Sequence, residues 1–124
     1  MIRIATKEAA KSEFYYRLGA VITKGKRILA SGYNAIQYCK LNNIKHSRHA
    51  EMHAISQLLR KEKGLSSLAG STIYVSRITP TGKTVLARPC SKCMSLIISV
   101  GIREIIYTTD NQSTERIKIG STNN

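Results

Sequence analysis

Two short motifs constrain this chain more than any other feature: His49-Ala50-Glu51 and Pro89-Cys90-Ser91-Lys92-Cys93. Together they supply one imidazole and two thiols, which are donors that zinc prefers, and one carboxylate. Each motif lies where a helix is expected to begin. A fold that uses both motifs must therefore bring two helix N-termini to one point, and the sequence predicts a single metal site there.

The spacing of Cys90 and Cys93 fits this site. Residues three apart in the first turn of a helix lie on the same face, so the two sulfurs can share one ion. A helix N-terminus lowers the pKa of a cysteine thiol, so we expect both sulfurs to be deprotonated at neutral pH. A C-x-x-C pair can instead be redox-active, but here a separate histidine is available as a third ligand.

His49 and Glu51 raise a geometric conflict, because residues two apart on an ideal helix lie roughly 200° from each other about its axis. We expect His49 to lie at the very start of the helix, before the backbone becomes regular, and Glu51 to project from the first turn. Three protein ligands leave one tetrahedral position for water, which is typical of a catalytic zinc site. Glu51 is then placed to take a proton from that water.

The other histidines and the third cysteine are weaker candidates for metal ligands. His49 and His53 have the spacing of a metalloprotease helix, but that motif has its Glu directly after the first His, and this chain reads H-A-E-M-H. His53 is expected to be a partly buried helix histidine and His46 a loop residue. Cys39 is expected to act as a small hydrophobic residue. Cys39 and His46 are too few ligands to predict a second metal.

The chain carries a net charge of +13, from 20 Lys and Arg against 7 Asp and Glu. Such a charge favours anionic substrates such as nucleotides, or RNA and single-stranded DNA as partners. The basic residues are spread evenly along the chain, so a generally basic, well-solvated surface is an equal alternative.

The remaining composition predicts a soluble cytoplasmic protein. The three cysteines form no disulfide framework if two bind metal, which fits a reducing compartment. The sequence has neither a membrane-spanning apolar run of about 18 residues nor a signal-peptide pattern. A length of 124 residues suits one domain, expected over residues 1–120, followed by a flexible tail at 121–124.

Hydrophobic periodicity predicts the order of the elements. The first half of the chain is predicted to hold a helix over 6–17 with Thr6 as N-cap, a hairpin of strands 18–23 and 27–33, and a polar irregular stretch over 34–48 that walls the site. A helix over 49–63, closed by Gly64, and a strand over 72–78 follow. After a turn at 79–82 and a basic loop to Pro89, we expect a buried helix over 90–100 ended by Gly101, a strand over 102–108 and an edge strand over 115–119. This order predicts an α/β fold with a mixed sheet, in which ligands bind at strand C-termini and helix N-termini.

With both motifs in view, the chain resembles the zinc-dependent cytidine and deoxycytidylate deaminases from about residue 18 to residue 108. The resemblance implies a three-layer cytidine-deaminase-like fold with a five-stranded mixed sheet and helices on both faces. It also implies that His49, Cys90 and Cys93 bind Zn²⁺ and that Glu51 shuttles protons. Members of this family commonly form oligomers that complete each other's pockets, so a homo-oligomer is expected.

Within the family, residues 32–34 (Gly-Tyr-Asn) and 93–102 are similar to segments of deoxycytidylate deaminases. This likeness implies that Asn34 hydrogen-bonds the substrate; the alternative is that Asn34 is only a turn residue that ends a strand. Ala50 is expected to contact the substrate as well. Asn34 is followed by Ala35 where the family usually has Gly, and no phosphate motif is present. Four basic residues near the site in sequence are candidates for phosphate contacts: Lys45, Arg48, Lys83 and Arg88.

The leading hypothesis is therefore hydrolytic deamination of cytidine, deoxycytidine or dCMP to the uracil product and ammonia. The first alternative is deamination of a base within tRNA or a single-stranded polynucleotide, which the positive charge would suit. Against the tRNA adenosine deaminases, Ser47-Arg48 precedes His49 where that family has a small residue, and no Glu precedes Pro89. The second alternative is a noncatalytic zinc-stabilised binding domain, against which the presence of Glu51 argues.

Overall fold

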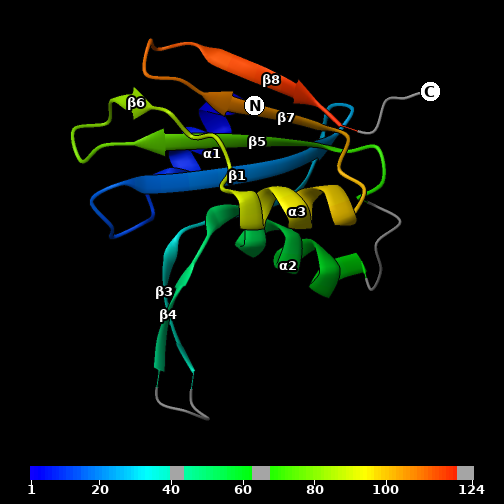
Figure 1. Cartoon of the computed structure of the whole chain (residues 1–124), viewed down its shortest axis with the longest axis horizontal. Coiled ribbons are helices and arrows are strands. Elements are labelled where there is room, and N and C mark those ends of the chain that lie inside the picture. Colours follow the sequence, from blue (N-terminus) through cyan, green and yellow to red (C-terminus); the bar gives the residue numbers. More distant parts are fainter. Residues whose placement is uncertain (40–43, 63–67, 120–124) are drawn as a thin grey trace.

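A mixed sheet forms the middle layer of the protein in the computed structural model (Figure 1). The structure describes residues 1–39, 44–62 and 68–119; of residues 36–39, 44–47 and 62 it describes only the backbone. The strand order is β2 (Arg27–Tyr33), β1 (Arg17–Lys24), β5 (Thr72–Ile78), β7 (Glu104–Thr108) and β8 (Thr114–Lys118). Strands β5 and β7 are parallel and the other neighbours antiparallel. This confirms the predicted five-stranded mixed sheet. Gly64 and the tail at 121–124 lie outside the described residues.

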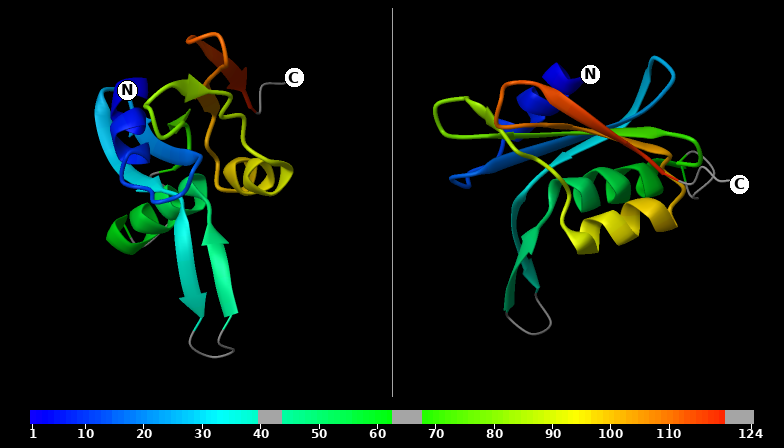
Figure 2. Two further views of the ribbon diagram at one scale, coloured as in Figure 1. Left: turned by 90° about the vertical axis from the view of Figure 1, so that its left-hand side faces the viewer. Right: turned by 45° about the horizontal axis from the view of Figure 1, so that its top comes forward.

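Helices cover both faces of the sheet, as predicted. Helix α1 (Ile2–Ala9) packs on one face, and α2 (Ala50–Glu62) and α3 (Ser91–Ser99) lie side by side on the other (Figures 1 and 2). The main hydrophobic core fills the space between the sheet and the α2–α3 layer. Its largest fully buried side chains are Ile22, Leu58, Leu68, Ile73, Val75, Ile97, Ile102 and Ile105.

Helix α2 approaches the edge strand β2 unusually closely at Gly32. A Cβ atom added at Gly32 would lie 2.5 Å from the Ala54 nitrogen and 2.9 Å from the Ala50 oxygen, both backbone atoms of α2. Ala50 and Ala54 are themselves fully buried. Small residues on both sides therefore let the first turns of α2 pack against the strand backbone.

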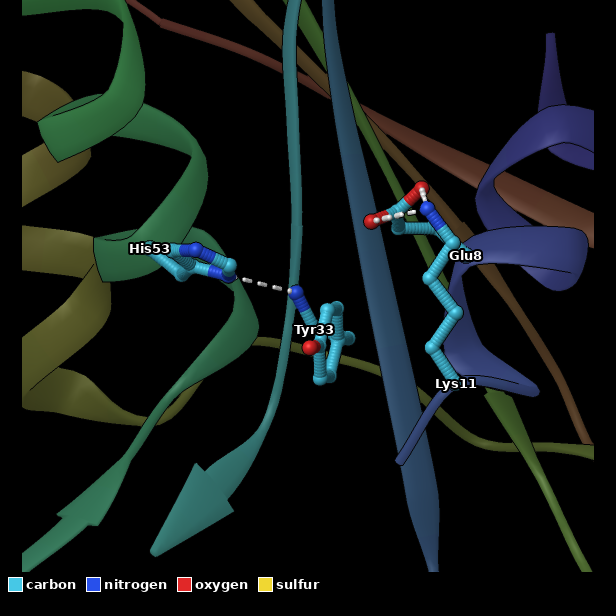
Figure 3. Close-up of polar contacts among 4 residues, drawn as sticks. All are labelled: Glu8, Lys11, Tyr33 and His53. Carbon is cyan, nitrogen blue, oxygen red and sulfur yellow. Dashed lines mark hydrogen bonds and ion pairs between the residues drawn. The ribbon is translucent and has the colours of Figure 1, made fainter. Parts of the chain in front are cut away.

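His53 adds a polar link between the same two elements (Figure 3). Its Nδ1 accepts a hydrogen bond of 3.0 Å from the backbone N–H of Tyr33, and its ring packs edge-on against the Tyr33 ring at 5.3 Å. Burial, reinforced by the nearby charge of Arg48, lowers the pKa of His53 below its ordinary value. The prediction of a partly buried helix histidine is confirmed, and its role is to join α2 to β2 in the neutral form.

The stretch over 34–48 is not irregular, as was predicted, but forms the hairpin of β3 (Ala35–Cys39) and β4 (Ile44–Arg48). The alternation in Ile36-Gln37-Tyr38 fits a strand, and the polar character of the stretch concealed it. The hairpin projects away from the sheet and helices (Figures 1 and 2).

The first helix begins at Ile2 and ends at Ala9, so the prediction of a helix over 6–17 was wrong. Thr6 is not an N-cap: its hydroxyl donates to the Ile2 carbonyl at 3.0 Å and lies 2.7 Å from the Ser76 hydroxyl on β5. After the helix, the Ser12 hydroxyl accepts the Phe14 N–H at 3.2 Å, a local turn that competes with helix continuation. The chain from Phe14 is thereby directed toward the start of β1.

Smaller differences affect the second half of the chain. The loop predicted after the turn at 79–82 contains the short strand β6 (Thr84–Val85), which pairs with the end of β5. Helix α3 was predicted to be a buried helix, but only one side of it is buried: Cys93 and Ile97 are buried, whereas Ile98 is 51% exposed. Gly101, with a φ of +91°, ends that helix as predicted. No helix in the described part of the chain is both long and apolar enough to span a membrane.

The contact at Gly32 predicts that Gly32→Ala destabilises the protein. The added methyl group meets backbone atoms that cannot turn aside, and overpacking of this kind costs about 1–3 kcal/mol of unfolding free energy. Thermal and urea unfolding of both proteins would measure the loss. Ser31→Ala, one residue earlier in the strand, is the matched control, and equal stability of Gly32→Ala and wild type would contradict the close packing.

The His53 contact predicts a pH-dependent stability. Because the folded pKa of His53 lies below its ordinary value of 6.5, the unfolded chain takes up the proton first, and stability is lost as pH falls below about 6.5. His53→Phe keeps a ring but neither titrates nor accepts the Tyr33 hydrogen bond. We expect the variant to be less stable than wild type at about pH 7.5 and to lose less of its stability as the pH falls from about 7.5 to about 5.5. Thermal unfolding across that range would show it, and identical pH profiles would exclude the role.

Candidate active site

The N-termini of α2 and α3 lie next to each other (Figure 1). His49, Cys90 and Cys93 come together at these helix starts. Their ligand atoms all lie within 4.8 Å of one another. His49 Nδ1 is 3.1 Å from Cys93 Sγ and 3.8 Å from Cys90 Sγ. Among the residues that the structure describes, no other group of three or more His, Cys, Asp or Glu side chains is placed to hold a metal ion.

The local backbone explains how these side chains converge. Helix α2 begins at Ala50, so His49 directly precedes it, and Glu51 lies in the first turn. Cys90 is the N-cap of α3 with extended backbone, φ −69° and ψ 167°, and Cys93 lies in the first turn. Both helices begin one residue later than predicted. The conflict between His49 and Glu51 is resolved as expected, because His49 is not in regular helix.

The donor set fits zinc. One imidazole and two sulfurs make three of the four ligands of a tetrahedral site, and thiolates select zinc over hard cations. The pKa of the Cys93 thiol is raised, not lowered as was expected from the helix N-terminus, because burial, with a smaller contribution from the nearby Glu51 charge, disfavours the thiolate. A metal ion that binds this sulfur must therefore displace a proton, and its affinity falls with falling pH.

Glu51 is the buried carboxyl group of the site. It is only 3% exposed and lines the same pocket as His49 and Cys90. Burial raises the pKa of Glu51, and a backbone hydrogen bond and the charge of His49 offset this only in part. A carboxyl group in this state keeps its proton to a higher pH than an exposed glutamate, which suits a group that both accepts and donates protons.

A pocket of about 300 Å³ opens beside these groups. The residues that line it come from the α1–β1 connection, from β1 and β5, from the β2–β3 junction, from the β6–α3 loop and from the starts of α2 and α3: Phe14, Tyr16, Leu18, Asn34, His49, Ala50, Glu51, Arg77, Arg88 and Cys90. Three predicted substrate-binding residues, Asn34, Ala50 and Arg88, are therefore at the pocket.

Asn34 is 6% exposed and connects the pocket wall to β1. Its Oδ1 accepts the Leu18 N–H at 2.8 Å, and its Nδ2 donates to the Tyr16 carbonyl at 3.1 Å. The amide thus holds the Tyr16–Leu18 segment in place. Asn34 lies between the end of β2 and the start of β3 and lines the pocket as well.

Two other predicted phosphate contacts, Arg48 and Lys83, are not among the described residues that line the pocket. Arg48 donates from Nε to the Tyr33 carbonyl at 3.3 Å, and its guanidinium lies 5.0 Å from the centre of the Tyr33 ring. Lys83 is exposed in the turn after β5. Lys45 lies in β4, but its side chain is outside the described residues, as are those of Cys39 and His46.

Two pocket residues were missed by reasoning from sequence: Leu18 and Arg77. Arg77 is a charged residue near the end of a strand that is otherwise apolar or uncharged, Thr-Ile-Tyr-Val-Ser-Arg-Ile. That position, at the carboxyl end of a strand and facing the ligand-binding edge, was the signal that could have identified it.

Comparisons with known proteins agree with this geometry. Residues 1–109 match the family model of the cytidine and deoxycytidylate deaminase zinc-binding region. ComE operon protein 2 of Bacillus subtilis (strain 168) is 31% identical over an alignment of 104 residues, which covers 75% of this chain and 48% of that protein. The chain thus spans about half the length of this curated relative.

Solved structures show the same fold. A cytidine deaminase from Burkholderia pseudomallei superposes with a TM-score of 0.71 at 18% identity, over 94% of this chain and 88% of that one. The apo dCMP deaminase of cyanophage S-TIM5 gives a TM-score of 0.65 at 22% identity, over 87% and 79% of the two chains. With most of its length matched by the family model and a His/Cys/Cys group at the expected place, the chain belongs to the cytidine and deoxycytidylate deaminase zinc-binding family.

Proposed function

We propose that this protein is a hydrolytic deaminase that converts a cytosine nucleoside or nucleotide to the uracil product and ammonia. The observation that carries the proposal is the buried carboxyl group of Glu51 beside His49, Cys90 and Cys93 in one pocket. A protein of similar fold, the dCMP deaminase of cyanophage S-TIM5, has been solved in complex with dCMP and dUMP. That pair differs only by the exchange of an amino group for oxygen.

In this proposal His49, Cys90 and Cys93 hold the zinc ion. When bound, zinc supplies Lewis acidity that makes water a competent nucleophile near neutral pH. The partly exposed His49 and the exposed Cys90 leave the group accessible from the pocket, while Cys93 anchors it from the buried side.

Glu51 acts as the general base and general acid of the proposed reaction. Replacement of the amino group at C4 requires that water lose its protons, that N3 of the ring be protonated and that the amino nitrogen leave as ammonia. Glu51 accepts a proton from the attacking water, delivers it to N3 and then transfers a second proton to the departing nitrogen. Its burial supports this role, because a raised pKa brings the carboxyl group closer to neutral pH, where both transfers are feasible.

Asn34, Ala50 and Arg88 are the substrate contacts that the pocket supports. Among the described residues, each end of the Asn34 amide makes one hydrogen bond, so one N–H and one acceptor position remain for a ligand. Ala50 contributes no bulk beside the carboxyl group. Arg88 donates from Nη1 to the Tyr107 hydroxyl at 3.3 Å and keeps other donors for an anion.

A second candidate is deamination of a base within a single-stranded polynucleotide. The observation that favours it is the exposed pair Tyr15 and Tyr16, 67% and 45% exposed, of which Tyr16 reaches the pocket. Aromatic side chains beside basic ones are typical of surfaces that stack unpaired bases. Binding of a cytosine-bearing oligonucleotide that weakens steeply with salt would favour this candidate over a free nucleotide. The homo-oligomer and the cytoplasmic location stay predictions.

The metal group predicts one zinc ion per chain, lost on mutation of its ligands. Cys90→Ser should remove most of the bound zinc while the fold persists, because Cys90 is exposed. Elemental analysis and competition with a chelator would measure zinc content and affinity. Cys39→Ser is the matched control: unchanged zinc is expected, and a lower content in that variant would instead reveal a second site.

Replacement of Glu51 tests the proposed chemistry. Glu51→Gln should keep zinc but lower the turnover of cytosine substrates by about 100- to 10,000-fold, the usual contribution of general acid–base catalysis. Since a raised folded pKa means that the charged form is disfavoured, stability is lost as pH rises through that pKa. At about pH 7.5, the variant with the neutral amide should therefore unfold at an equal or higher temperature than wild type.

The assay is ammonia release from cytidine, deoxycytidine, dCMP and a cytosine-bearing oligonucleotide, with zinc content and thermal unfolding measured in parallel. Glu13→Gln, which neutralises an exposed carboxylate, is the control and should react as wild type does. Full activity in Glu51→Gln would overturn the proton-transfer role. If zinc-loaded wild type deaminates none of these substrates, the noncatalytic zinc-stabilised binding domain is favoured over the deaminase.

A further inference from the structure

Arg77 is a pocket residue that the chemistry described so far does not use. It lies one residue before the end of β5, paired with Leu18 of β1 on one side and Val85 of β6 on the other. Both Arg77 and Leu18 line the pocket that contains Glu51. Its position is at the carboxyl end of β5, the edge at which ligands of α/β sheets bind.

The side chain of Arg77 is held in place by an aromatic stack. Its guanidinium carbon lies 4.2 Å from the centre of the Tyr16 ring, and Tyr15 packs edge-on against Tyr16 at 4.9 Å. The Asn34 amide in turn fixes the backbone at Tyr16. A guanidinium stacked in this way loses little further conformational entropy when it binds a ligand.

The hydrogen-bonding capacity of Arg77 is largely unused. Nη1 donates to the Leu86 carbonyl at 3.5 Å, the limit of a hydrogen bond, and Nε is buried without a partner. Within the described part of the chain, no carboxylate forms an ion pair with this residue. A buried charged donor that is left unpaired costs free energy, so an unpartnered one beside a pocket points to an external acceptor.

The charge of the pocket favours an anion as that acceptor. Two guanidinium groups, those of Arg77 and Arg88, line it against the single carboxyl group of Glu51. Guanidinium groups present a planar fork of donors that matches the oxygens of a phosphate. The volume of about 300 Å³ is that of a small-molecule site, not of a groove that follows a polynucleotide backbone.

We propose that Arg77, supported by Tyr16, binds the phosphate of a cytosine nucleoside monophosphate and makes the enzyme selective for the nucleotide over the nucleoside. This inference rests on the proposed function and names its substrate class. In this role Arg77 takes the place of the phosphate contacts expected from Arg48 and Lys83, which do not line the pocket. Arg88 lies on the same pocket and contributes a second cation.

The test compares kcat/KM for dCMP and deoxycytidine in zinc-loaded wild type, Arg77→Ala and Arg77→Lys. Wild type should prefer dCMP. Arg77→Ala should lower kcat/KM for dCMP by about 10- to 100-fold, the value of a charge-assisted hydrogen bond or two, while deoxycytidine changes less than about threefold. Arg77→Lys should retain part of the preference, because it keeps the charge but not the planar fork.

The matched control is Arg103→Ala, which removes an exposed arginine at the opposite end of the sheet, next to the start of β7. It should leave the preference for dCMP unchanged. Equal losses for both substrates in Arg77→Ala would show a structural role through Tyr16 and overturn the inference. So would a wild-type enzyme that shows no preference for the nucleotide.

A binding measurement separates this inference from the proposed chemistry. Calorimetry with dUMP and deoxyuridine needs no turnover: wild type should bind dUMP more tightly, and Arg77→Ala should bind the two almost equally. If no substrate is deaminated but this difference is seen, the phosphate site stands and the proposed reaction fails. If dUMP and deoxyuridine bind alike, or only an oligonucleotide binds, the phosphate site is overturned whatever the activity.

Discussion

The close approach of α2 to the edge strand β2 is the constraint on which the site depends. Gly32 lets the backbone of α2 reach the strand, and the hydrogen bond between His53 and the Tyr33 N–H fixes the helix along it. Since His49 directly precedes α2, this contact also determines where the imidazole lies. A shift of the helix by the width of one methyl group would move the imidazole away from Cys93, now 3.1 Å distant.

The second half of the site is positioned by a different device, the parallel pairing of β5 and β7. Parallel neighbours require a crossover, and α3 provides it, so its N-terminus lies at the same edge as the carboxyl end of β5. This is why Cys90 and Arg77, 13 positions apart in the chain, line one pocket. The metal group and the cationic end of the pocket are thus consequences of the same strand order.

The metal group could be predicted from sequence because its signal is local. A C-x-x-C pair and a histidine two residues before a carboxylate specify their own geometry once they lie at helix starts, and both helix starts were predicted to within one residue. The sheet was predictable for a similar reason, since its strands have strong hydrophobic patterns. What the motifs alone left open was how the rest of the pocket is built.

The errors arose where distant contacts decide the structure. The first helix was misplaced because Thr6 resembles an N-cap, whereas its hydroxyl in fact bonds Ser76 on a strand 70 positions away. The β3–β4 hairpin was predicted to be irregular because β4, Ile-Lys-His-Ser-Arg, is mostly polar. The hairpin also projects away from the main sheet (Figure 1). Phe14 and Tyr16 reach the pocket only because the helix ends early, which no pattern near them indicates.

The proposed role of Arg77 would give the family fold selectivity without a change in its metal group. Its neighbours Leu18 and Val85 hold the strand on both sides, and Tyr16 supports the guanidinium, so the charge is oriented before any ligand arrives. Stability alone does not account for this arrangement, because a buried, unpartnered Nε lowers stability where a hydrophobic residue would raise it. A cost of this kind is typical of residues retained for binding. The orientation of Arg77 is therefore best understood as preparation for an anion at the edge of the sheet where Glu51 also lies.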